Sequence, residues 1–347
     1  MQQINTALLS FGMSGQIFHA PFLQVNDGFN FYAVWERTKN LAQEKYPSVK
    51  TFRTLEELLS DEAIELVVVN TPSVTHYDYA KQCLQAGKNV IVEKPFTATV
   101  EEGEELIKLA KEKKVMLSVY QNRRYDSDYK ALKKVVDEKL LGDLIEAEFH
   151  YDRFTEQLSY KAHKETPTPG VGVLYDLGAH LIDQALQLFG MPKYVFADID
   201  VLRENSKVDD YFEIWMFYNH FRVRLHSSLL VREALPAYVI HGKKGSFIKA
   251  KTDVQEVALQ AGKIPNTLDW GTEPENEKGL LHTEINGKIV KEYIPSAKGN
   301  YMAYYDGIYK ALRMQQPPPV AAEEGLNVIR IIAAAYKSNE QKKAIEI

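Results

Sequence analysis

The sequence predicts an α/β protein: an N-terminal Rossmann dinucleotide-binding domain followed by a C-terminal α+β domain with a large, mostly antiparallel open sheet. Three observations predict it. Strand-like and helix-like segments alternate over the first 125 residues, a glycine-containing loop follows the first strand, and strand-like segments succeed one another after Leu144. The length of 347 residues indicates two domains. We place them at residues 1–122 and 123–347, with a final helix at about 322–338 packing back near the first domain.

The predicted strands of the first domain are short and almost continuously apolar, which is typical of parallel strands covered on both faces. They lie at Thr6–Leu9, Asn30–Trp35, Ile64–Asn70, Asn89–Val92 and Val115–Tyr120. Helical stretches at His76–Ala86 and Val100–Lys113 separate the later ones.

The second domain begins with an amphipathic helix at Ser127–Lys139 and then changes character. Strand patterns follow at Leu144–Phe154, Tyr194–Arg203, Tyr211–Tyr218, Arg222–Val231 and Tyr238–Gly242. Short turns between them favour antiparallel pairing, and one helix at Tyr175–Phe189 interrupts the series. The polar segment Gly262–Gly287 reads as a long ordered loop.

Composition and charge exclude several classes of function. The formal net charge is −5 with both signs interspersed, so neither nucleic-acid binding nor attachment to an anionic membrane is expected. The single cysteine, Cys83, fits a reducing compartment, and no signal peptide or long apolar run is visible. We therefore expect a cytoplasmic protein.

The loop after the first strand is close to the dinucleotide fingerprint G-x-G-x-x-G. Ser10 stands at its first position, Gly12 and Gly15 at the second and third, with Met13 and Ser14 between them. The second glycine lets the backbone approach a pyrophosphate and the third lets the helix pack on the strand. The two glycines could be simple turn residues, but their position between a strand and a helix favours a cofactor loop.

The cofactor choice rests on Glu36 and Arg37, which end the second predicted strand. An acid at this place accepts hydrogen bonds from the ribose hydroxyls of NAD, whereas a neighbouring arginine pairs with the 2′-phosphate of NADP. The two side chains point to opposite choices. We expect use of both cofactors with a slight preference for NAD.

Glu93-Lys94-Pro95 lies at the end of the fourth predicted strand, where open α/β sheets bind ligands. Lys94 could be an ordinary lysine in a solvated turn. The alternative is that it faces the ligand crevice and polarises a substrate oxygen.

The helix at residues 175–190 places Asp176, His180, Asp183, Gln184 and Gln187 on one face. This face could simply be solvated. Alternatively, Asp176 and His180 point together into a cleft, where a histidine that titrates near neutral pH exchanges a proton with a substrate hydroxyl. No metal site is expected, because this pair offers only two ligands.

Together these motifs resemble the glucose–fructose oxidoreductase, inositol dehydrogenase and rhizopine catabolism (Gfo/Idh/MocA) family. The motifs are Ser10-x-Gly12-x-x-Gly15, Thr71-Pro72-x-x-x-His76, Glu93-Lys94-Pro95 and Asp176-x-Gly178-x-His180. The stretches "LSVYQNRRYDSDY", "LYDLGAHLIDQALQLFG" and "EEGLNVIRII" are similar to the subgroup that contains scyllo-inositol dehydrogenases. Where close relatives often have Trp-Arg, this chain has Tyr160-Lys161.

The resemblance implies an NAD- or NADP-dependent oxidoreductase acting on a secondary alcohol of a cyclic polyol or sugar. By the same resemblance Lys94 polarises the reacting oxygen, Asp176 orients substrate hydroxyls and His180 is the general acid and base. The residues expected to bind cofactor are Ser10, Gly12, Met13, Ser14, Gly15, Glu36, Arg37, Thr71, Pro72, His76, Glu93 and Lys94. Those expected to bind substrate are Lys94, Asn122, Arg153, Asp176 and His180.

Two other functions remain open. Some members of the family are glycosidases that use bound NAD for transient oxidation, and such an enzyme would turn over without net NADH. A non-catalytic NAD(P)-binding sensor would need the glycine loop but not Lys94, Asp176 and His180.

We also expect a homodimer or homotetramer. The segment Tyr211–Tyr218 is apolar and aromatic on both faces of its strand, which is unusual for a sheet with one face in water.

Overall fold

The computed structural model describes residues 2–347, which form two compact units. The first unit comprises residues 2–122, 255–270 and 300–326, and the second comprises Arg123–Val254, Gly271–Gly299 and Asn327–Ile347. Residues 255–270 and 300–326 thus cluster with the first unit, although they follow the predicted boundary at residue 122.

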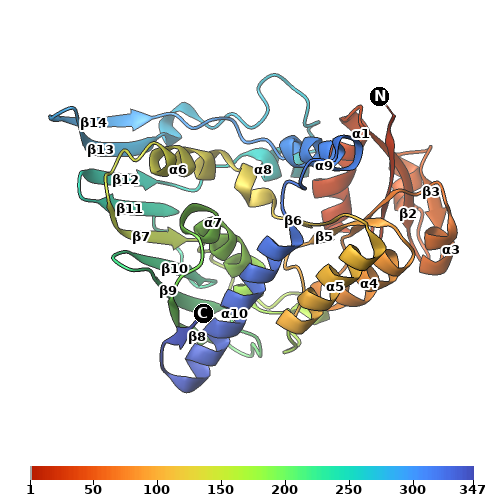
Figure 1. Ribbon diagram of the computed structural model, residues 1–347, viewed down its shortest axis with the longest axis horizontal. Helices are drawn as coiled ribbons and strands as arrows, with labels where there is room; N and C mark the ends of the chain where they lie inside the picture. The colour runs from red at the N-terminus through yellow and green to blue at the C-terminus, as the bar shows by residue number, and fades with distance from the viewer. Residues whose placement is uncertain (1) are drawn as a thin grey trace. The chain divides into compact units, whose positions relative to one another are not determined.

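The first unit contains a six-stranded parallel sheet in the order β3-β2-β1-β4-β5-β6. This is the strand order of a doubly wound dinucleotide-binding sheet. Its strands are β1 (Ile4–Leu8), β2 (Phe29–Trp35), β3 (Lys50–Phe52), β4 (Leu66–Val69), β5 (Asn89–Glu93) and β6 (Leu117–Tyr120) (Figure 1). The four apolar residues of β4 are all buried, as expected for a strand covered on both faces.

Two helices of the first unit, α3 (Leu55–Ser60) and α5 (Val100–Lys113), begin with a capping box that satisfies free N–H groups. At the start of α5, Thr99 accepts from Glu102 N, and the Glu102 side chain bonds back to Thr99 N. The other helices are α1 (Ala20–Val25), α2 (Leu41–Lys45), α4 (His76–Gln85), α8 (Gln255–Gln260) and α9 (Met302–Met314). Tyr305 of α9 is buried and stacks on Phe22 of α1, which ties residues 300–326 to the sheet's helical layer.

The second unit is built on a nine-stranded sheet in the order β14-β13-β12-β11-β7-β10-β9-β8-β15. Every neighbouring pair is antiparallel except β7 and β10, which run parallel. The strands are β7 (Leu144–His150), β8 (Tyr194–Asp200), β9 (Tyr211–Phe217), β10 (Arg222–Ser228), β11 (Tyr238–Gly242), β12 (Gly245–Lys249), β13 (Gly279–Ile285), β14 (Lys288–Ile294) and β15 (Ile345–Glu346).

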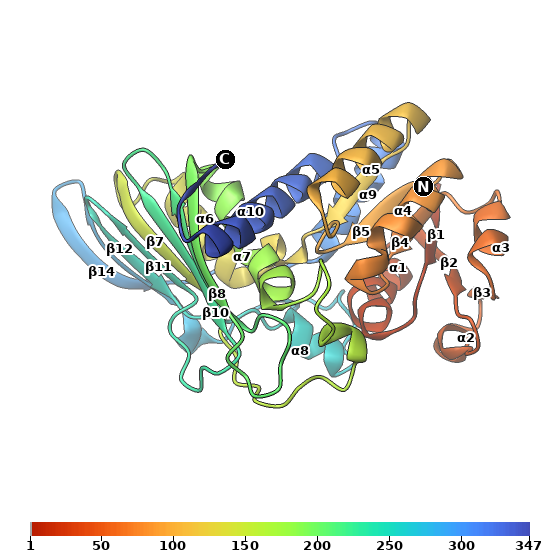
Figure 2. The ribbon, with the colours of Figure 1, turned by 90° about the horizontal axis from the view of Figure 1, so that it is seen from below.

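Helices cover one face of this sheet. Figure 2 shows α6 (Ser127–Asp137), α7 (Ala179–Phe189) and the later part of α10 (Ala322–Gln341) on the same side of the strands. Ser338 of α10 accepts a hydrogen bond from Ala197 N of β8 at 3.0 Å. In β9 the side chains Phe212, Ile214 and Met216 are buried, while the alternate positions are only partly covered.

The predicted fold class is confirmed: a Rossmann sheet is followed by a mostly antiparallel sheet. The prediction that Gly262–Gly287 is a loop is wrong at its end, because residues 279–285 form β13 and pair with β12 and β14. The sequence patterns also missed β3, β12, β14, β15, α2, α3, α8 and α9. None of the helices within residues 2–347 has the length and apolar character needed to cross a membrane.

Candidate active site

The glycine loop of the first unit has the geometry of a phosphate-binding turn. Ser10 Oγ accepts a hydrogen bond from Gly12 N at 3.1 Å, and helical residues begin at Met13. A Cβ on Gly15 would lie 2.4 Å from the Ser10 carbonyl oxygen, whereas a Cβ on Gly12 would meet only Ser10 Oγ, at 3.3 Å. Gly15 therefore lets the helix approach the strand, and Gly12 leaves the outer side of the loop open. The loop fits a dinucleotide pyrophosphate, which would receive the N–H groups of the first helical turn.

Glu36 lies at the end of β2, but its carboxylate has a structural task. Its two oxygens accept from Leu41 N at 3.2 Å and Ala42 N at 3.0 Å, so the side chain caps α2. Glu36 is 8 % exposed, whereas the next residue, Arg37, is exposed. The two side chains expected to select the cofactor thus differ in the structure. Glu36 is bonded to the backbone of α2, whereas Arg37 is exposed to solvent.

A buried polar chain joins the glycine loop to the end of β5. Glu93 Oε1 accepts from Ser14 Oγ at 2.6 Å and from His19 Nε2 at 2.9 Å, and His19 Nδ1 lies 2.7 Å from the Tyr305 hydroxyl. Burial alone would raise the pKa of Glu93, but His19 and Ser14 lower it on balance. Glu93 Oε2 in turn accepts from Lys94 N at 3.1 Å. The loop that carries Lys94 is therefore fixed to the phosphate loop.

His76 holds the ends of β4 and β5 together. Its Nδ1 lies 2.8 Å from the Pro95 carbonyl oxygen and its Nε2 lies 3.0 Å from the Thr71 carbonyl oxygen. Burial lowers the pKa of this imidazole. Pro72 O accepts from Thr75 N at 2.9 Å, and a cis peptide bond links Lys94 to Pro95. Thr71, Pro72 and His76 thus form the base of the loop that carries Lys94.

In the second unit, Asp176 and His180 lie on a helix that changes its winding between them. Leu174–Gly178 forms a π-helical turn, and α7 continues from Ala179. A π turn is frequent at functional sites and displaces side chains from the 100° spacing. Asp176 is accordingly half exposed and 3.5 Å from Lys164 Nζ, while His180 is 5 % exposed.

Of the other residues on the predicted polar face, Gln187 is exposed, whereas Asp183 and Gln184 are buried and bonded to other segments. Asp183 makes two hydrogen bonds with the Arg124 guanidinium, at 2.8 and 2.6 Å. Gln184 Nε2 donates to the Arg123 carbonyl oxygen at 3.1 Å, and its Oε1 accepts from the Tyr238 hydroxyl at 3.1 Å. These side chains fasten α7 to the segment 123–125, so only Asp176 and His180 of this face remain candidates for chemistry.

Tyr151 lies beside His180, with ring centroids 6.4 Å apart, and sequence reasoning missed it. Three cations surround its ring: Lys251 Nζ at 4.6 Å, Arg153 at 5.2 Å and Arg123 at 6.0 Å from the centroid. Burial would raise the pKa of the phenol, but Arg123, Lys251 and Arg153 lower it on balance. Arg153, a predicted substrate-binding residue, thus belongs to the surroundings of His180.

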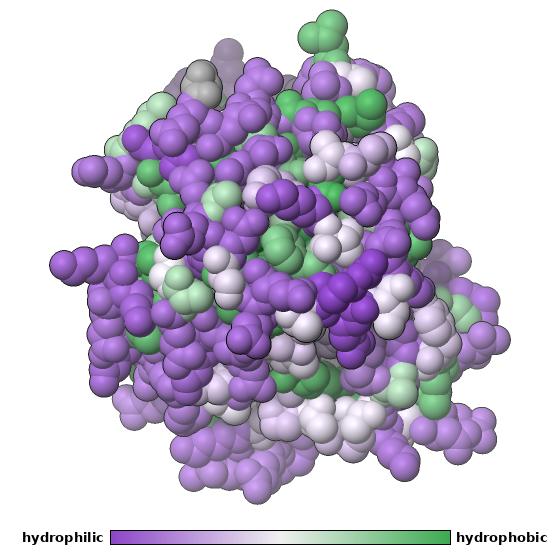
Figure 3. All heavy atoms as spheres, turned by 90° about the vertical axis from the view of Figure 1, so that its right-hand side faces the viewer, coloured by the Kyte–Doolittle hydropathy of each residue, from purple (hydrophilic) through white to green (hydrophobic). Residues whose placement is uncertain are grey.

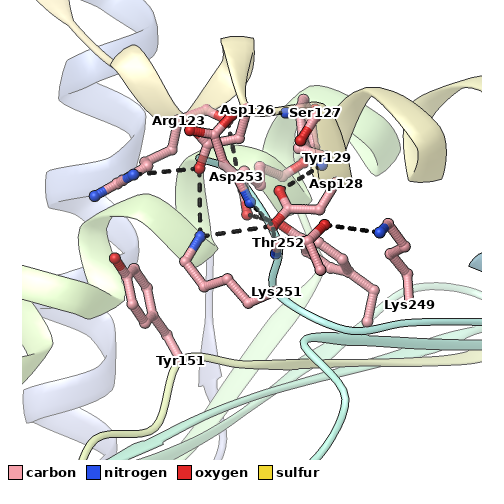
Figure 4. A network of polar contacts seen from close by, with 12 residues as sticks. Arg123, Asp126, Ser127, Asp128, Tyr129, Tyr151, Lys249, Lys251, Thr252 and Asp253 are labelled. Atoms are coloured by element: carbon pink, nitrogen blue, oxygen red, sulfur yellow. Dashed lines mark hydrogen bonds and ion pairs between the residues drawn. The ribbon is translucent and has the colours of Figure 1, made fainter. Parts of the chain in front are cut away.

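Figure 4 shows the network that positions two of these cations, Lys251 and Arg123. Lys251 Nζ lies 3.3 Å from Asp126 Oδ2 and 3.9 Å from Asp128 Oδ2, and Arg123 reaches Asp126 at 3.5 Å. Burial raises the pKa of Asp126 to about 7. Asp128 Oδ2 also accepts from Thr252 N at 2.8 Å, which attaches the segment after β12 to the start of α6.

The predicted site residues fall into two groups. The twelve cofactor candidates and Asn122, which is 5 % exposed, belong to the first unit. Arg153, Asp176 and His180 belong to the second unit. The structure adds His19 to the first group and Tyr151 to the second. Neither sits in a recognised motif, so only the three-dimensional contacts reveal them.

Two family models match the chain. Residues 4–121 match the NAD-binding Rossmann fold of the Gfo/Idh/MocA oxidoreductase family, and residues 133–347 match the C-terminal alpha/beta domain of the same family.

Named relatives and solved structures extend these matches. The chain is 43 % identical over 343 residues to scyllo-inositol 2-dehydrogenase (NADP(+)) IolW of Bacillus subtilis, covering 99 % of this chain and 95 % of that protein. It is 28 % identical over 251 residues to scyllo-inositol 2-dehydrogenase (NADP(+)) IolU of the same organism, covering 69 % and 75 %. The crystal structure of an oxidoreductase from Bacillus cereus superposes with a TM-score of 0.92 at 33 % identity, covering 99 % of both chains.

Proposed function

Because the chain belongs to the Gfo/Idh/MocA family of oxidoreductases, we propose that it interconverts a secondary alcohol and a ketone on an inositol-type cyclic polyol or a sugar. The main support is its likeness, over almost the whole chain, to a protein named scyllo-inositol 2-dehydrogenase. The glycine loop of the first unit and the acid–base pair of the second supply the parts that such a reaction needs.

When bound, the nicotinamide supplies the two-electron acceptor or donor for the substrate carbon. Gly12 and the first helical turn after it would hold the pyrophosphate, and Gly15 permits the close packing that shapes this turn. The chain from Ser14 through Glu93 to Lys94 N keeps the lysine's loop in a constant position relative to the phosphate loop.

His180 is the group we propose to take the proton from the substrate hydroxyl and to return it in the reverse direction. Lys94 stabilises the negative charge that develops on the substrate oxygen, as a cation does best in a site from which water is excluded. Asp176 is half exposed, so it can accept a hydrogen bond from a second hydroxyl of the polyol and orient the ring.

We further propose that NADP(H) is the preferred form of the cofactor. Glu36 is engaged in capping α2, so its carboxylate is not directed as a ribose acceptor. Arg37 is exposed and can pair with the 2′-phosphate of NADP. The relative named above carries NADP(+) in its name, which supports the same choice. This revises the slight preference for NAD expected from the sequence.

A substrate panel tests the proposed reaction. Purified protein is mixed with inositols, hexoses, uronates and N-acetylhexosamines, each with NAD or NADP, and the reduced-cofactor absorbance is followed. We expect kcat/KM to be highest for a cyclic polyol with NADP. Absence of turnover with every polyol and sugar, in both directions, would contradict the proposal.

Two variants test the cofactor choice. Arg37→Ser should lower kcat/KM for NADP by roughly tenfold or more, equivalent to about 1.4 kcal/mol, and leave NAD nearly unchanged. Glu36→Ser is the matched control and should leave the NADP-to-NAD ratio unmoved. A wild type that prefers NAD, with a ratio that Glu36→Ser shifts toward NADP, would show that Glu36 governs the choice.

A further inference from the structure

Two histidines and an aspartate come together where β7 and β10 run side by side. His226 of β10 lies directly opposite His150 of β7 in the parallel register. Asp152 follows His150 by two residues. The pairing with β10 continues past it, since Tyr151 N donates to the His226 carbonyl oxygen and Arg153 N donates to the Ser228 carbonyl oxygen, each at 3.0 Å. Alternation places His150 and Asp152 on one face of the sheet.

The ligand atoms of these three residues face one another. His226 Nδ1 lies 3.0 Å from Asp152 Oδ1, and His150 Nδ1 lies 3.6 Å from Asp152 Oδ2. One ligand atom from each residue lies within 4.8 Å of the other two. The side chains of His150 and Asp152 are each 2 % exposed and that of His226 is 17 % exposed. This is a buried donor set rather than a surface cluster.

His150 has a nitrogen that lacks a hydrogen bond. Its Nε2 lies 3.4 Å from Glu148 Oε2, so the tautomer that is protonated at Nε2 can donate to that carboxylate. That tautomer leaves Nδ1 with a bare lone pair, and this buried atom makes no hydrogen bond within residues 2–347. A buried polar atom without a hydrogen bond lowers the free energy of unfolding by about 1–3 kcal/mol, so a bound ligand at Nδ1 would remove this cost.

We propose that His150, Asp152 and His226 bind a divalent transition-metal ion through both Nδ1 atoms and the aspartate carboxylate. Two imidazole nitrogens and one carboxylate oxygen are the donor set that suits Zn²⁺ and its neighbours. Ligand atoms around a tetrahedral Zn²⁺ lie roughly 3.3 Å apart, given metal–ligand distances of about 2.0 Å. The two imidazole-to-carboxylate separations, 3.0 Å to Asp152 Oδ1 and 3.6 Å to Asp152 Oδ2, are close to that spacing, and all three ligand atoms lie within 4.8 Å of one another. A water molecule would complete the coordination.

The surroundings have the arrangement that orients metal ligands. Metal-binding histidines usually donate their second ring N–H to a carboxylate, and Glu148 Oε2 lies 3.4 Å from His150 Nε2, where it can accept such a bond. Arg224 holds Glu148 in place at 3.3 Å, and Ser228 N donates to Asp152 Oδ1 at 3.1 Å.

The site lies on the face of the sheet opposite α7. Phe149 and Tyr151, the residues that alternate with His150 and Asp152, contact Phe189 and His180 through their rings. The metal would therefore fasten β7 to β10 without touching the proposed acid–base residue. The metal ion would have a structural role, so the test of this site does not depend on the proposed reaction.

His150 and Asp152 are neighbours on β7, whereas His226 is brought to them by the pairing of β7 with β10. The sequence pattern alone therefore does not predict this site.

Metal titration of the full-length protein tests the inference. Protein treated with EDTA and desalted is titrated with Zn²⁺ or Co²⁺, with Mg²⁺ as the negative probe. We expect one Zn²⁺ per chain by elemental analysis, visible Co²⁺ absorption bands of a nitrogen–oxygen site, and a rise in melting temperature with Zn²⁺ but not with Mg²⁺.

Variants locate the ion. His226→Ala and Asp152→Asn should each lose the bound ion and the cobalt bands. His282→Ala is the control, because it removes an exposed histidine from β13 of the same sheet. Equal metal content in all variants would mean adventitious binding and would overturn the proposal. If His226→Ala fails to fold, the titration of the wild-type protein remains a test. A wild-type protein that takes up no Zn²⁺ and keeps its melting temperature would also overturn the proposal.

Discussion

Lys94 and His180 are expected to matter for turnover rather than for cofactor affinity, since neither belongs to the glycine loop. Lys94→Ala and His180→Ala should each lower kcat by ~100- to 10,000-fold, the usual cost of losing an acid–base or charge-stabilising group. The dissociation constant for NADP(H), measured by fluorescence titration, should change little. His220→Ala, in an exposed turn, is the control histidine. A His180→Ala enzyme that kept the wild-type rate across pH would contradict the assignment.

Tyr151 should ionise at a lower pH than an ordinary tyrosine, because Arg123, Lys251 and Arg153 favour its phenolate over its neutral form. An ultraviolet difference titration should show tyrosinate absorbance in the wild type below the usual range near pH 10. The Tyr151→Phe variant should lack this low-pH ionisation step and keep the ionisation of the other tyrosines at higher pH. Identical titration curves for the two proteins would show that the cations do not act on this phenol.

At the scale of single residues, local motifs predicted the positions of the glycine loop and of Lys94, but not the direction of every side chain. Glu36 is predicted to bind a ribose, and the structure adds that its oxygens accept from two N–H groups of α2, a helix too short for its pattern to be recognised. Tyr151 depends on cations from three separate segments. Such contacts join segments that are far apart in the sequence, so a local sequence pattern cannot predict them.

At the scale of elements, the turn from β1 into its helix separates two glycine roles. Gly12→Ala should keep the melting temperature, because its Cβ would meet only Ser10 Oγ at 3.3 Å, but should weaken NADPH binding by tenfold or more. Gly15→Ala should lower both the melting temperature and the affinity for NADPH, because its Cβ would lie 2.4 Å from a backbone oxygen. Thermal melts and fluorescence titrations measure the two effects. A Gly12→Ala protein with wild-type NADPH affinity would contradict the assignment of the loop.

Long periodic elements were predictable and irregular ones were not. The predicted helix at Val100–Lys113 has the observed bounds, since its apolar positions and Thr99–Glu102 capping box agree. The strand β13 was hidden because it carries polar residues at its end and follows a long polar segment. The π turn at Leu174–Gly178 changes the direction of Asp176 relative to His180, and a 100° wheel cannot represent that change.

At the scale of the whole molecule, the sheet of the second unit leaves an aromatic face that helices do not cover. Tyr211, Trp215 and Phe217 are the partly covered positions of β9, and Phe196 of β8 pairs with Trp215. By contrast, the face drawn in Figure 3 is mostly hydrophilic, with apolar residues in small separate spots. We therefore expect this sheet face to pair with a second copy of the chain.

Light scattering should give the mass of a dimer or tetramer at micromolar concentration. Phe196→Glu should shift the protein toward the monomer, because a buried unpaired charge opposes association. Leu268→Glu, at a leucine that is 98 % exposed outside this sheet, is the control. A monomer mass for the wild type would contradict the expectation.

The order of the domains along the chain was predictable from the change in pattern after residue 125. The segments that make up each domain were not predictable, because residues 255–270 and 300–326 belong to the first unit. Buried aromatic residues of α9 pack against α1 and β6 and so stabilise this arrangement, but α1 and β6 lie far from α9 in the sequence.

The most direct test of the central claim compares product with reduced cofactor. The protein is incubated with NADP and the cyclic polyol that gives the highest kcat/KM, and the ketone is quantified by mass spectrometry alongside the NADPH absorbance. We predict equal amounts of ketone and NADPH, with both lost in His180→Ala. Turnover of substrate without net NADPH, or reduced cofactor without a ketone, would contradict a dehydrogenase.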